Sequence, residues 1–430
     1  MTAIRSSYTD SIGFFGQEDP KELAARFGTP LYVYNEKLLR QRCQDLKGLS
    51  SHPHFHVNYS AKANTNIALL RIIREEGCVV DAMSPGELAA NKAAGFDEQS
   101  ITYISNNISA AEMQNALDCG LLISVDSLSQ LEQCGKLNVG GRVMVRFNPG
   151  IGAGHHKKVI TAGKETKFGV TPDCMEQVFA ILDKYSMTMT GMNQHIGSLF
   201  MQPEGYIEAA AFLLHLAEQL PPERFAQLDH IDFGGGFGIP YHKYEGEKPL
   251  DIAALGTSLH ELITTWTEKT GYTGGFYIEP GRYIAAECGL LLGRVHAVKN
   301  NGENRYVGTD IGFNVLVRPA MYDSFHDIEI YRGHDASPRQ PMPQTVVGNI
   351  CESGDILAKN RLLPEMHEDD LVGVLDAGAY GYTMASPYNQ RLRPAEVLIT
   401  AQGTAQLIRR RENINDLMRG YEGLSYPSRV

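Results

Sequence analysis

The sequence lacks the features that mark secreted, metal-binding, membrane and nucleic-acid-binding proteins. Its seven cysteines are scattered, odd in number and free of any C-x-x-C pair, which predicts a reducing compartment, the cytoplasm, and no zinc or other metal framework. No apolar run is long enough to cross a bilayer, and the N-terminus has no basic region followed by an apolar core. Positive charge is in deficit, since the formal net charge is -11, and this argues against nucleic acid or an anionic membrane as a partner.

What remains is the composition of an ordinary globular protein. The chain has 430 residues, of which 43% are hydrophobic and 21% are charged, and this length predicts about two to three domains with a large core. Together with the absences, these values favour an enzyme that acts on small molecules.

Strand-like and helix-like segments alternate from residue 57 to residue 279. In segment 204–219, for example, Tyr206, Ala210, Leu213 and Ala217 fall on one face of a helix. The eight candidate strands are 57–61, 79–83, 101–105, 122–126, 142–148, 189–195, 231–233 and 276–279. Eight strands with intervening helices predict an α/β fold, a (β/α)8 TIM-type barrel over residues 36–282, rather than an open doubly wound sheet.

The pattern of secondary-structure signals in the sequence changes after about residue 283. Short β-like runs follow one another, separated by Gly, Pro and Asn turns, at 290–298, 305–308, 328–331, 345–347, 371–375, 396–399 and 405–409. This pattern predicts an all-β domain, a sandwich or barrel. We expect the early strand at 30–34 to join it, so that the second domain comprises residues 1–35 and 283–430.

Polar residues gather where the barrel strands end, which is where such barrels keep their chemistry. Lys62 follows the first strand, and a glycine run at 234–236 follows the seventh. A lone loop lysine is usually only solvated, and a lone triple glycine is usually a tight turn. Because glycines let backbone N–H groups approach an anion, and Ser198 and Arg282 also stand at strand ends, we predict a phosphate site there.

A phosphate site beside a lysine and a carboxylate favours pyridoxal 5'-phosphate as the cofactor. Lys62 would bind its aldehyde covalently, and Glu279 would lie against the pyridine nitrogen and keep it protonated. His195 would lie against the face of the ring, although a satisfied core histidine explains that residue equally well when its neighbours are ignored.

Several segments together carry a resemblance to a known family. Tyr-Ser-Ala-Lys-Ala-Asn at 59–64, His-Ile-Gly-Ser at 195–198, the glycine run and Glu-Pro-Gly-Arg at 279–282 resemble the fold type III, or alanine-racemase-fold, decarboxylases. Arg-Phe-Asn-Pro at 146–149, Arg-Pro-Ala-Met-Tyr at 318–322, Cys-Glu-Ser-Gly-Asp at 351–355 and Gly-Ala-Tyr-Gly at 378–381 narrow it to the diaminopimelate decarboxylase family. The resemblance spans nearly the whole chain.

The resemblance implies decarboxylation of meso-2,6-diaminopimelate to L-lysine and carbon dioxide, the last step of lysine biosynthesis. The cofactor residues that it implies are Lys62, His195, Ser198, Gly235, Gly236, Glu279, Gly281, Arg282 and Tyr380. The substrate residues are Arg282, Arg318, Tyr322, Glu352 and Tyr380. Cys351 would be the catalytic proton donor. The family forms homodimers in which the neighbouring subunit supplies Cys351 and Glu352 to a shared active site.

The chemistry of these side chains agrees with those roles. An arginine fork such as that of Arg318 matches a carboxylate, and Glu352 matches an ammonium group. A cysteine can act as a general acid when its pKa lies near the working pH. An isolated cysteine is more often a small buried hydrophobe, but Cys351 lies in a polar stretch between strands.

Some positions depart from the family pattern. Pro85 stands where the family more often has glycine or another small residue. Asp323 stands where glycine is usual, and Leu392 stands where proline is frequent. Asp323 would place a negative charge near the far end of the substrate, so it bears on substrate identity. Segment 150–169 resembles the family's mobile lid, and its adjacent His155 and His156 are expected to be solvated rather than metal-bound.

Three alternatives stay open at this stage. A decarboxylase of lysine, ornithine or a polyamine precursor would share the cofactor residues but would have no need of Arg318. A racemase on the same fold would have no need of a cysteine donor such as Cys351. A cofactor-binding barrel without catalysis would lack the second domain.

Overall fold

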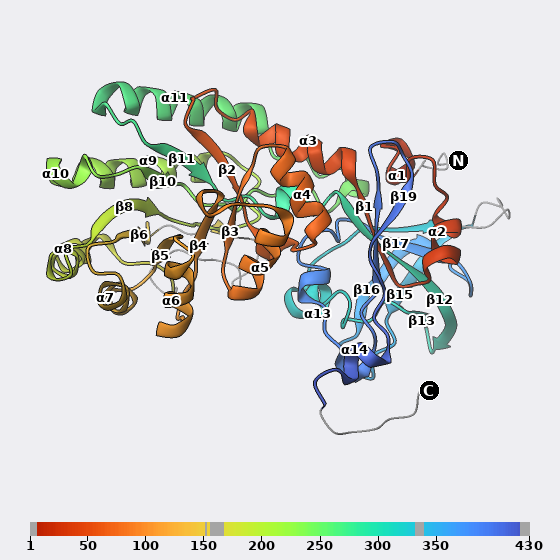
Figure 1. Ribbon diagram of the computed structural model, residues 1–430. Helices are drawn as coiled ribbons and strands as arrows, with labels where there is room; N and C mark the ends of the chain where they lie inside the picture. The colour runs from red at the N-terminus through yellow and green to blue at the C-terminus, as the bar shows by residue number, and fades with distance from the viewer. Residues whose placement is uncertain (1–6, 151–152, 155–166, 332–338, 422–430) are drawn as a thin grey trace. The chain divides into compact units, whose positions relative to one another are not determined.

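The computed structural model in Figure 1 describes residues 7–150, 153–154, 167–331 and 339–421. The chain divides into two compact units. The first, which we call the barrel unit, comprises residues 37–240 and 246–287, and the second, the sheet unit, comprises residues 1–36, 241–245 and 288–430. Most of the expected lid, including His155 and His156, lies outside the described residues.

Eight parallel strands close into a barrel in the barrel unit, as the alternation of strands and helices predicts (Figure 1). In their spatial order they are β10 (His230–Asp232), β11 (Gly275–Ile278), β2 (Phe55–Tyr59), β3 (Val79–Ala82), β4 (Ile101–Ile104), β5 (Leu122–Val125), β6 (Arg142–Arg146) and β8 (Thr188–Asn193). Two short strands, β7 (Ala153–Gly154) and β9 (Gly197–Ser198), pair with each other. The predicted (β/α)8 barrel is confirmed.

Helices precede, connect and follow these strands in the chain. They are α3 (Glu36–Lys47), α4 (Ile67–Glu75), α5 (Pro85–Ala94), α6 (Ala110–Asp118), α7 (Leu128–Leu137), α8 (Met175–Lys184), α9 (Glu204–Glu218), α10 (Pro222–Phe225), α11 (Ile252–Thr270) and α12 (Arg282–Ala285). The Asn66 side chain caps α4, whose Leu69, Ile72 and Ile73 are buried. Pro85 is the first residue of α5, where its fixed φ suits a helix start, and Ser84 caps that helix.

The sheet unit is built on a nine-stranded sheet. Its strands are β1 (Leu31–Asn35), β12 (Gly289–Asn301), β13 (Asn304–Thr309), β14 (Ile328–Tyr331), β15 (Pro341–Val347), β16 (Ile356–Pro364), β17 (Leu371–Val374), β18 (Ala395–Ile399) and β19 (Ala405–Arg409). Its helices are α1 (Tyr8–Ser11), α2 (Pro20–Phe27), α13 (Arg318–Tyr322) and α14 (Ile414–Met418). As predicted, β1 joins this sheet, lying antiparallel to β12 and parallel to β18.

Within the described part of this sheet, β16 is a strand that the sequence pattern did not predict. Its central residues Lys359, Asn360 and Arg361 interrupt any alternation of apolar and polar side chains. Asn360 also has a φ of 45°, and the pairing of β15 with β16 shifts register between Gln344 and Val347. An irregular ladder of this kind leaves no period-two signal in the sequence.

A short piece of chain between β10 and α11 belongs to the sheet unit. In this segment, 241–245, Lys243 Nζ pairs with both carboxylate oxygens of Asp376 at 2.8 Å. The backbone N–H groups of Lys243 and Tyr244 donate to Asp327 Oδ2 at 2.8 and 3.3 Å, and the Tyr244 hydroxyl donates to Glu329 at 2.5 Å. These buried polar contacts fix the segment within the sheet unit.

Candidate active site

Lys62 lies in a short 3-10 helix, Ala61–Ala63, directly after β2. The Ala61 N–H donates to Asp81 Oδ1 at 2.8 Å, and the Ser60 hydroxyl donates to Asp81 Oδ2 at 3.0 Å. The Ser60 N–H donates to the Pro280 carbonyl at 3.0 Å. The turn that carries Lys62 is therefore held from two sides, by β3 and by the residues that follow β11.

Asp81 was not among the predicted site residues, although it holds the Lys62 turn. Burial raises the pKa of Asp81 to about 8; the Lys62 ammonium opposes that rise, and Glu279 and Glu87 add to it. The rule that found Lys62 would also have found Asp81, because Asp81 lies near the end of the next barrel strand.

Two buried carboxyl groups, those of Glu279 and Asp232, lie side by side near Lys62. Burial raises the pKa of each above its ordinary value, and the neighbouring Asp232 raises that of Glu279 further, while Lys62 lowers it. Among the described residues, Glu279 Oε1 and Asp232 Oδ2 are buried without another hydrogen-bond partner. Because burial and mutual repulsion favour the neutral form, at least one of the two carboxyl groups is suited to hold a proton.

His195 is neutral in this setting. Burial lowers the pKa of His195 well below its ordinary value, and the cations Lys62 and Arg146 lower it further. The Gly197 N–H lies 3.1 Å from His195 Nδ1, so this ring nitrogen is the acceptor. A neutral imidazole offers a flat face near the Lys62 cation.

Arg146, at the end of β6, is a buried cation that the list of predicted site residues omitted. Burial lowers its pKa, whereas the carboxylates Glu279, Asp126 and Asp232 raise it. Its guanidinium lies 4.9 Å from the centroid of the Phe168 ring. Arg146 thus supplies positive charge to the cluster of buried carboxyl groups, and its place at a strand end was the available signal.

The glycine run after β10 packs so closely that side chains do not fit. A Cβ on Gly235 would lie 1.9 Å from the Glu279 carbonyl oxygen. Gly236 has a φ of 110°, and a Cβ there would lie 2.6 Å from the Gly197 carbonyl oxygen. Nearby, Arg282 Nη2 donates to the Ser198 hydroxyl at 2.9 Å. The backbone and these two polar side chains therefore form a surface suited to an anion such as a phosphate.

The residues in the barrel unit fit the predicted cofactor. Glu279 is only 5% exposed and offers a buried carboxyl for a ring nitrogen. The neutral His195, the glycine run, Arg282 and Ser198 match a flat ring that carries a phosphate group. Gly281 directly precedes α12, and Lys62 is close enough to the carboxyl groups to alter their pKa values.

The remaining predicted residues lie in the sheet unit. Arg318, the first residue of α13, is 3% exposed and donates to the Ser324 hydroxyl at 3.2 Å. Its guanidinium lies 5.6 Å from the Tyr241 ring centroid and 5.8 Å from that of Tyr380. Tyr380 has a φ of 56°, which is unusual for a bulky side chain and typical of functional positions. Tyr322 ends the same helix.

Asp323 has a local structural explanation. It caps the C-terminus of α13 in the left-handed conformation, with a φ of 52° and a ψ of 29°, and it is exposed. Glycine adopts this conformation most easily, and aspartate is among the few other residues that tolerate it. The substitution of aspartate for glycine therefore preserves the helix end.

Cys351 and Glu352 lie in an exposed loop between β15 and β16. The buried Asp355 orders this loop, since its carboxylate accepts the Ile350 N–H at 2.7 Å and the Phe313 N–H at 2.6 Å. The exposure of Cys351 agrees with the expected proton donor and disagrees with a buried structural cysteine.

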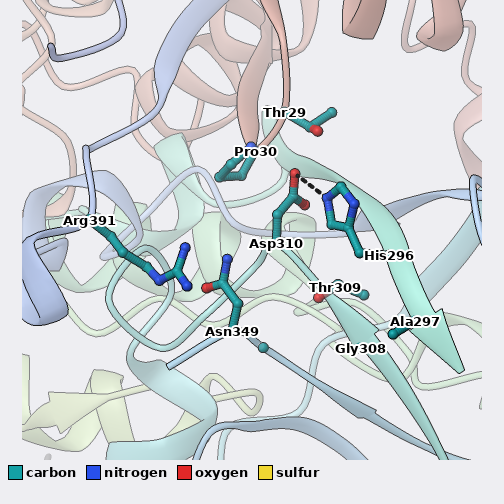
Figure 2. Close-up of a pocket in the computed structure, with 10 residues that line it drawn as sticks. Thr29, Pro30, His296, Ala297, Gly308, Thr309, Asp310, Asn349 and Arg391 are labelled. Carbon is teal, nitrogen blue, oxygen red and sulfur yellow. Dashed lines mark ion pairs between the residues drawn. The ribbon is translucent and has the colours of Figure 1, made fainter. Parts of the chain in front are cut away.

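A cavity of about 640 Å³ lies in the sheet unit (Figure 2). Arg391 and Asn349 face it from one side, and His296 Nε2 lies 3.6 Å from Asp310 Oδ2 on the other. The cavity is also lined by Thr29, Pro30, Ala297, Gly308, Thr309 and Gly348. None of the predicted cofactor or substrate residues is among these, so the cavity does not mark the candidate active site.

Comparisons with known proteins agree with this chemistry. Residues 37–286 match the family model described as "Pyridoxal-dependent decarboxylase, pyridoxal binding domain". The chain is 41% identical to a diaminopimelate decarboxylase of Methanothermobacter thermautotrophicus, over 94% of each protein. It is 33% identical to the one from Escherichia coli, over 93% of this chain and 96% of that protein.

Solved structures give the same picture. A diaminopimelate decarboxylase from Helicobacter pylori complexed with L-lysine has a TM-score of 0.83 and 29% identity, and the match covers 93% of this chain and 98% of that one. A lysine/ornithine decarboxylase from Vibrio vulnificus shares the fold, with a TM-score of 0.76, but only 23% identity. No helix among the described residues is long and apolar enough to cross a membrane.

Proposed function

The chain belongs to the diaminopimelate decarboxylases, a family of pyridoxal-dependent decarboxylases, and from this premise we propose that it converts meso-2,6-diaminopimelate to L-lysine and carbon dioxide. The observation that carries the proposal is the cluster at the barrel strand ends, where Lys62 lies beside the buried carboxyl pair of Glu279 and Asp232. A lysine/ornithine decarboxylase shares only the fold at this level of identity, so the relatives favour diaminopimelate over those substrates.

The barrel residues would hold pyridoxal 5'-phosphate. When bound, the cofactor supplies an electron sink for the carbon that loses carbon dioxide. Lys62 would bind the aldehyde, while Gly235, Gly236, Ser198, Gly281 and Arg282 would hold the phosphate. Glu279 would keep a proton at the ring nitrogen, because a buried carboxylate beside that nitrogen favours its protonated form. The flat, neutral imidazole of His195 would pack on the ring.

Sheet-unit residues would recognise the substrate. Diaminopimelate carries an amino group and a carboxylate at each end, so the end that does not react needs both a cation and an anion as partners. Arg318 would bind the carboxylate with its planar fork, and Glu352 would bind the ammonium group. Arg282, Tyr322 and Tyr380 would add contacts to substrate or cofactor.

Cys351 would deliver a proton to the carbon that has lost its carboxylate. A thiol is a suitable donor because a modest shift of its pKa brings it near neutrality. We propose that the partner subunit of a homodimer supplies Cys351 and Glu352. The cytoplasm is the proposed compartment, since Cys351 must stay reduced.

The test is to incubate purified protein with pyridoxal phosphate and meso-diaminopimelate and to measure carbon dioxide and L-lysine together. Equal amounts of the two products are expected. L-Lysine and L-ornithine serve as competing substrates, and Lys62→Ala is the inactive control. Release of carbon dioxide from lysine or ornithine with a higher kcat/KM than from diaminopimelate would overturn the proposal.

A further inference from the structure

A short turn of the sheet unit contacts the Cys351–Glu352 loop at two points. This turn, Tyr388–Gln390, is a 3-10 helix that follows Pro387. The Tyr388 hydroxyl donates to Glu352 Oε1 at 2.5 Å, and the Cys351 N–H donates to Asn389 Oδ1 at 3.1 Å. One contact holds a side chain and the other holds the backbone, so the turn fixes two adjacent residues of the loop.

The turn is itself held in place. The Tyr388 ring stacks on Phe313, with centroids 5.5 Å apart and planes 23° from parallel. The Phe313 N–H donates to Asp355, the carboxylate that orders the other end of the Cys351–Glu352 loop. Asn389 adopts a φ of 55°, a left-handed conformation that asparagine tolerates better than most residues. The loop and the turn thus form one connected network.

We propose that Tyr388 is a positioning residue that holds the Glu352 carboxylate ready for the ammonium group at the far end of the substrate. The inference rests on the proposed function, which assigns Glu352 to that group. A flexible glutamate side chain samples several rotamers, and an ordered one loses less conformational entropy when substrate binds.

The chemistry of a phenol suits this task. An ionised carboxylate has about four acceptor positions, so one phenol O–H leaves the others for an ammonium group. A lysine or arginine in the same place would neutralise Glu352 and compete with the substrate. Donation to Glu352 raises the pKa of Tyr388, so the phenol keeps its proton at neutral pH.

The first test is Tyr388→Phe, which removes the hydroxyl and keeps the ring against Phe313. This change removes one charge-assisted hydrogen bond, at the Glu352 carboxylate that binds the ammonium group. The KM for diaminopimelate should therefore rise about 3- to 10-fold, and kcat should change less than about twofold. Inhibition by cadaverine, which has amino groups and no carboxylate, should weaken by the same factor. An unchanged KM and inhibition constant would overturn the proposal.

A double-mutant cycle separates positioning from a general structural effect. In a Glu352→Ala background, Tyr388→Phe should cause no further loss, because the hydroxyl has no carboxylate left to hold. Losses that multiply in the double variant would overturn the proposal. Tyr421→Phe is the matched control, since Tyr421 is 56% exposed in the same unit and should have no effect.

A spectroscopic measurement tests the role of Tyr388 separately from the proposed decarboxylase activity. In protein labelled with 3-fluorotyrosine, the 19F resonance missing from Tyr388→Phe identifies Tyr388. The resonance of Tyr388 should shift in Glu352→Ala. It should also shift when cadaverine is added to the labelled protein without substitutions. A shifted resonance in a protein that does not decarboxylate diaminopimelate would overturn the proposed function alone. An active protein whose Tyr388 resonance responds to neither change would overturn the role of Tyr388 alone.

Discussion

The backbone beside Lys62 is held in place by hydrogen bonds of its own turn. Two hydrogen bonds to Asp81 and one to Pro280 hold residues Ser60 and Ala61, so the backbone that precedes Lys62 is ordered. We expect borohydride reduction of the cofactor-loaded protein to attach the cofactor permanently to Lys62. Peptide mapping by mass spectrometry should find the added mass on that residue. The same adduct should form in Lys92→Ala, a variant of a surface lysine, and an adduct on any other lysine would contradict the assignment.

Arg318 permits a prediction about the far carboxylate of the substrate. Decarboxylation removes one carboxylate and leaves the other on L-lysine, whereas cadaverine has none. Losing one partner of a desolvated charge pair costs about 2–5 kcal/mol. Arg318→Ala should therefore lower kcat/KM for diaminopimelate by roughly 30- to several-thousand-fold.

Inhibition constants test which group Arg318 binds. In Arg318→Ala, inhibition by L-lysine should weaken while inhibition by cadaverine should stay the same. Tyr388→Phe is expected to differ, because it should weaken inhibition by cadaverine. If Arg318→Ala weakened cadaverine as much as lysine, Arg318 would be a structural residue of α13 rather than a ligand of the carboxylate.

Individual residues were predictable where a strand-end rule or a motif applied to them. Lys62, His195, Glu279 and Arg282 were predicted in this way, and all four lie in the barrel unit. Asp81 obeys the same strand-end rule but was not singled out, because it belongs to none of the motifs that carried the resemblance. The role of Tyr388 could not be predicted, since it depends on a contact with Glu352, 36 positions away in sequence.

Among the elements, the glycine run after β10 gives the sharpest prediction. A Cβ at position 235 would lie 1.9 Å from a backbone oxygen, which no side-chain movement can relieve. We expect Gly235→Ala to abolish retention of the cofactor, measured by absorbance after gel filtration, and to lower the midpoint of thermal unfolding. Gly205→Ala in α9 is the control, because a Cβ there meets nothing within 4 Å. Full cofactor content in Gly235→Ala would show that the run is not the phosphate site.

The elements themselves were largely predictable because their side-chain periods are regular. The barrel strands are short apolar runs separated by helices with one buried face, so their number could be counted. Strand β16 and segment 241–245 were not predictable. In β16 the ladder is irregular, and in segment 241–245 the buried pair of Lys243 and Asp376 joins residues 133 positions apart. Contacts over such a separation leave no local pattern.

At the scale of the whole molecule, the predicted site residues divide between the two units. Lys62 and the cofactor residues of the strand ends belong to the barrel unit, whereas Cys351, Glu352 and Arg318 belong to the sheet unit. The relatives match this chain over both units. The proposal that the partner subunit supplies Cys351 can be tested by mixing variants of the complete chain.

We expect two inactive variants, Lys62→Ala and Cys351→Ala, to regain activity when their subunits exchange. If Cys351 acts on the partner's site, one site of each mixed dimer combines both substitutions and the other is intact. With equal amounts and random exchange, half of the dimers are mixed, so activity should reach about a quarter of that of the unsubstituted protein in a two-fold symmetric dimer. A double variant that carries both substitutions in one chain, mixed with either parent, is the control that should stay inactive, because no site in those dimers is intact. Exchange verified by mass spectrometry, with both parents folded and no recovered activity, would show that each subunit uses its own Cys351.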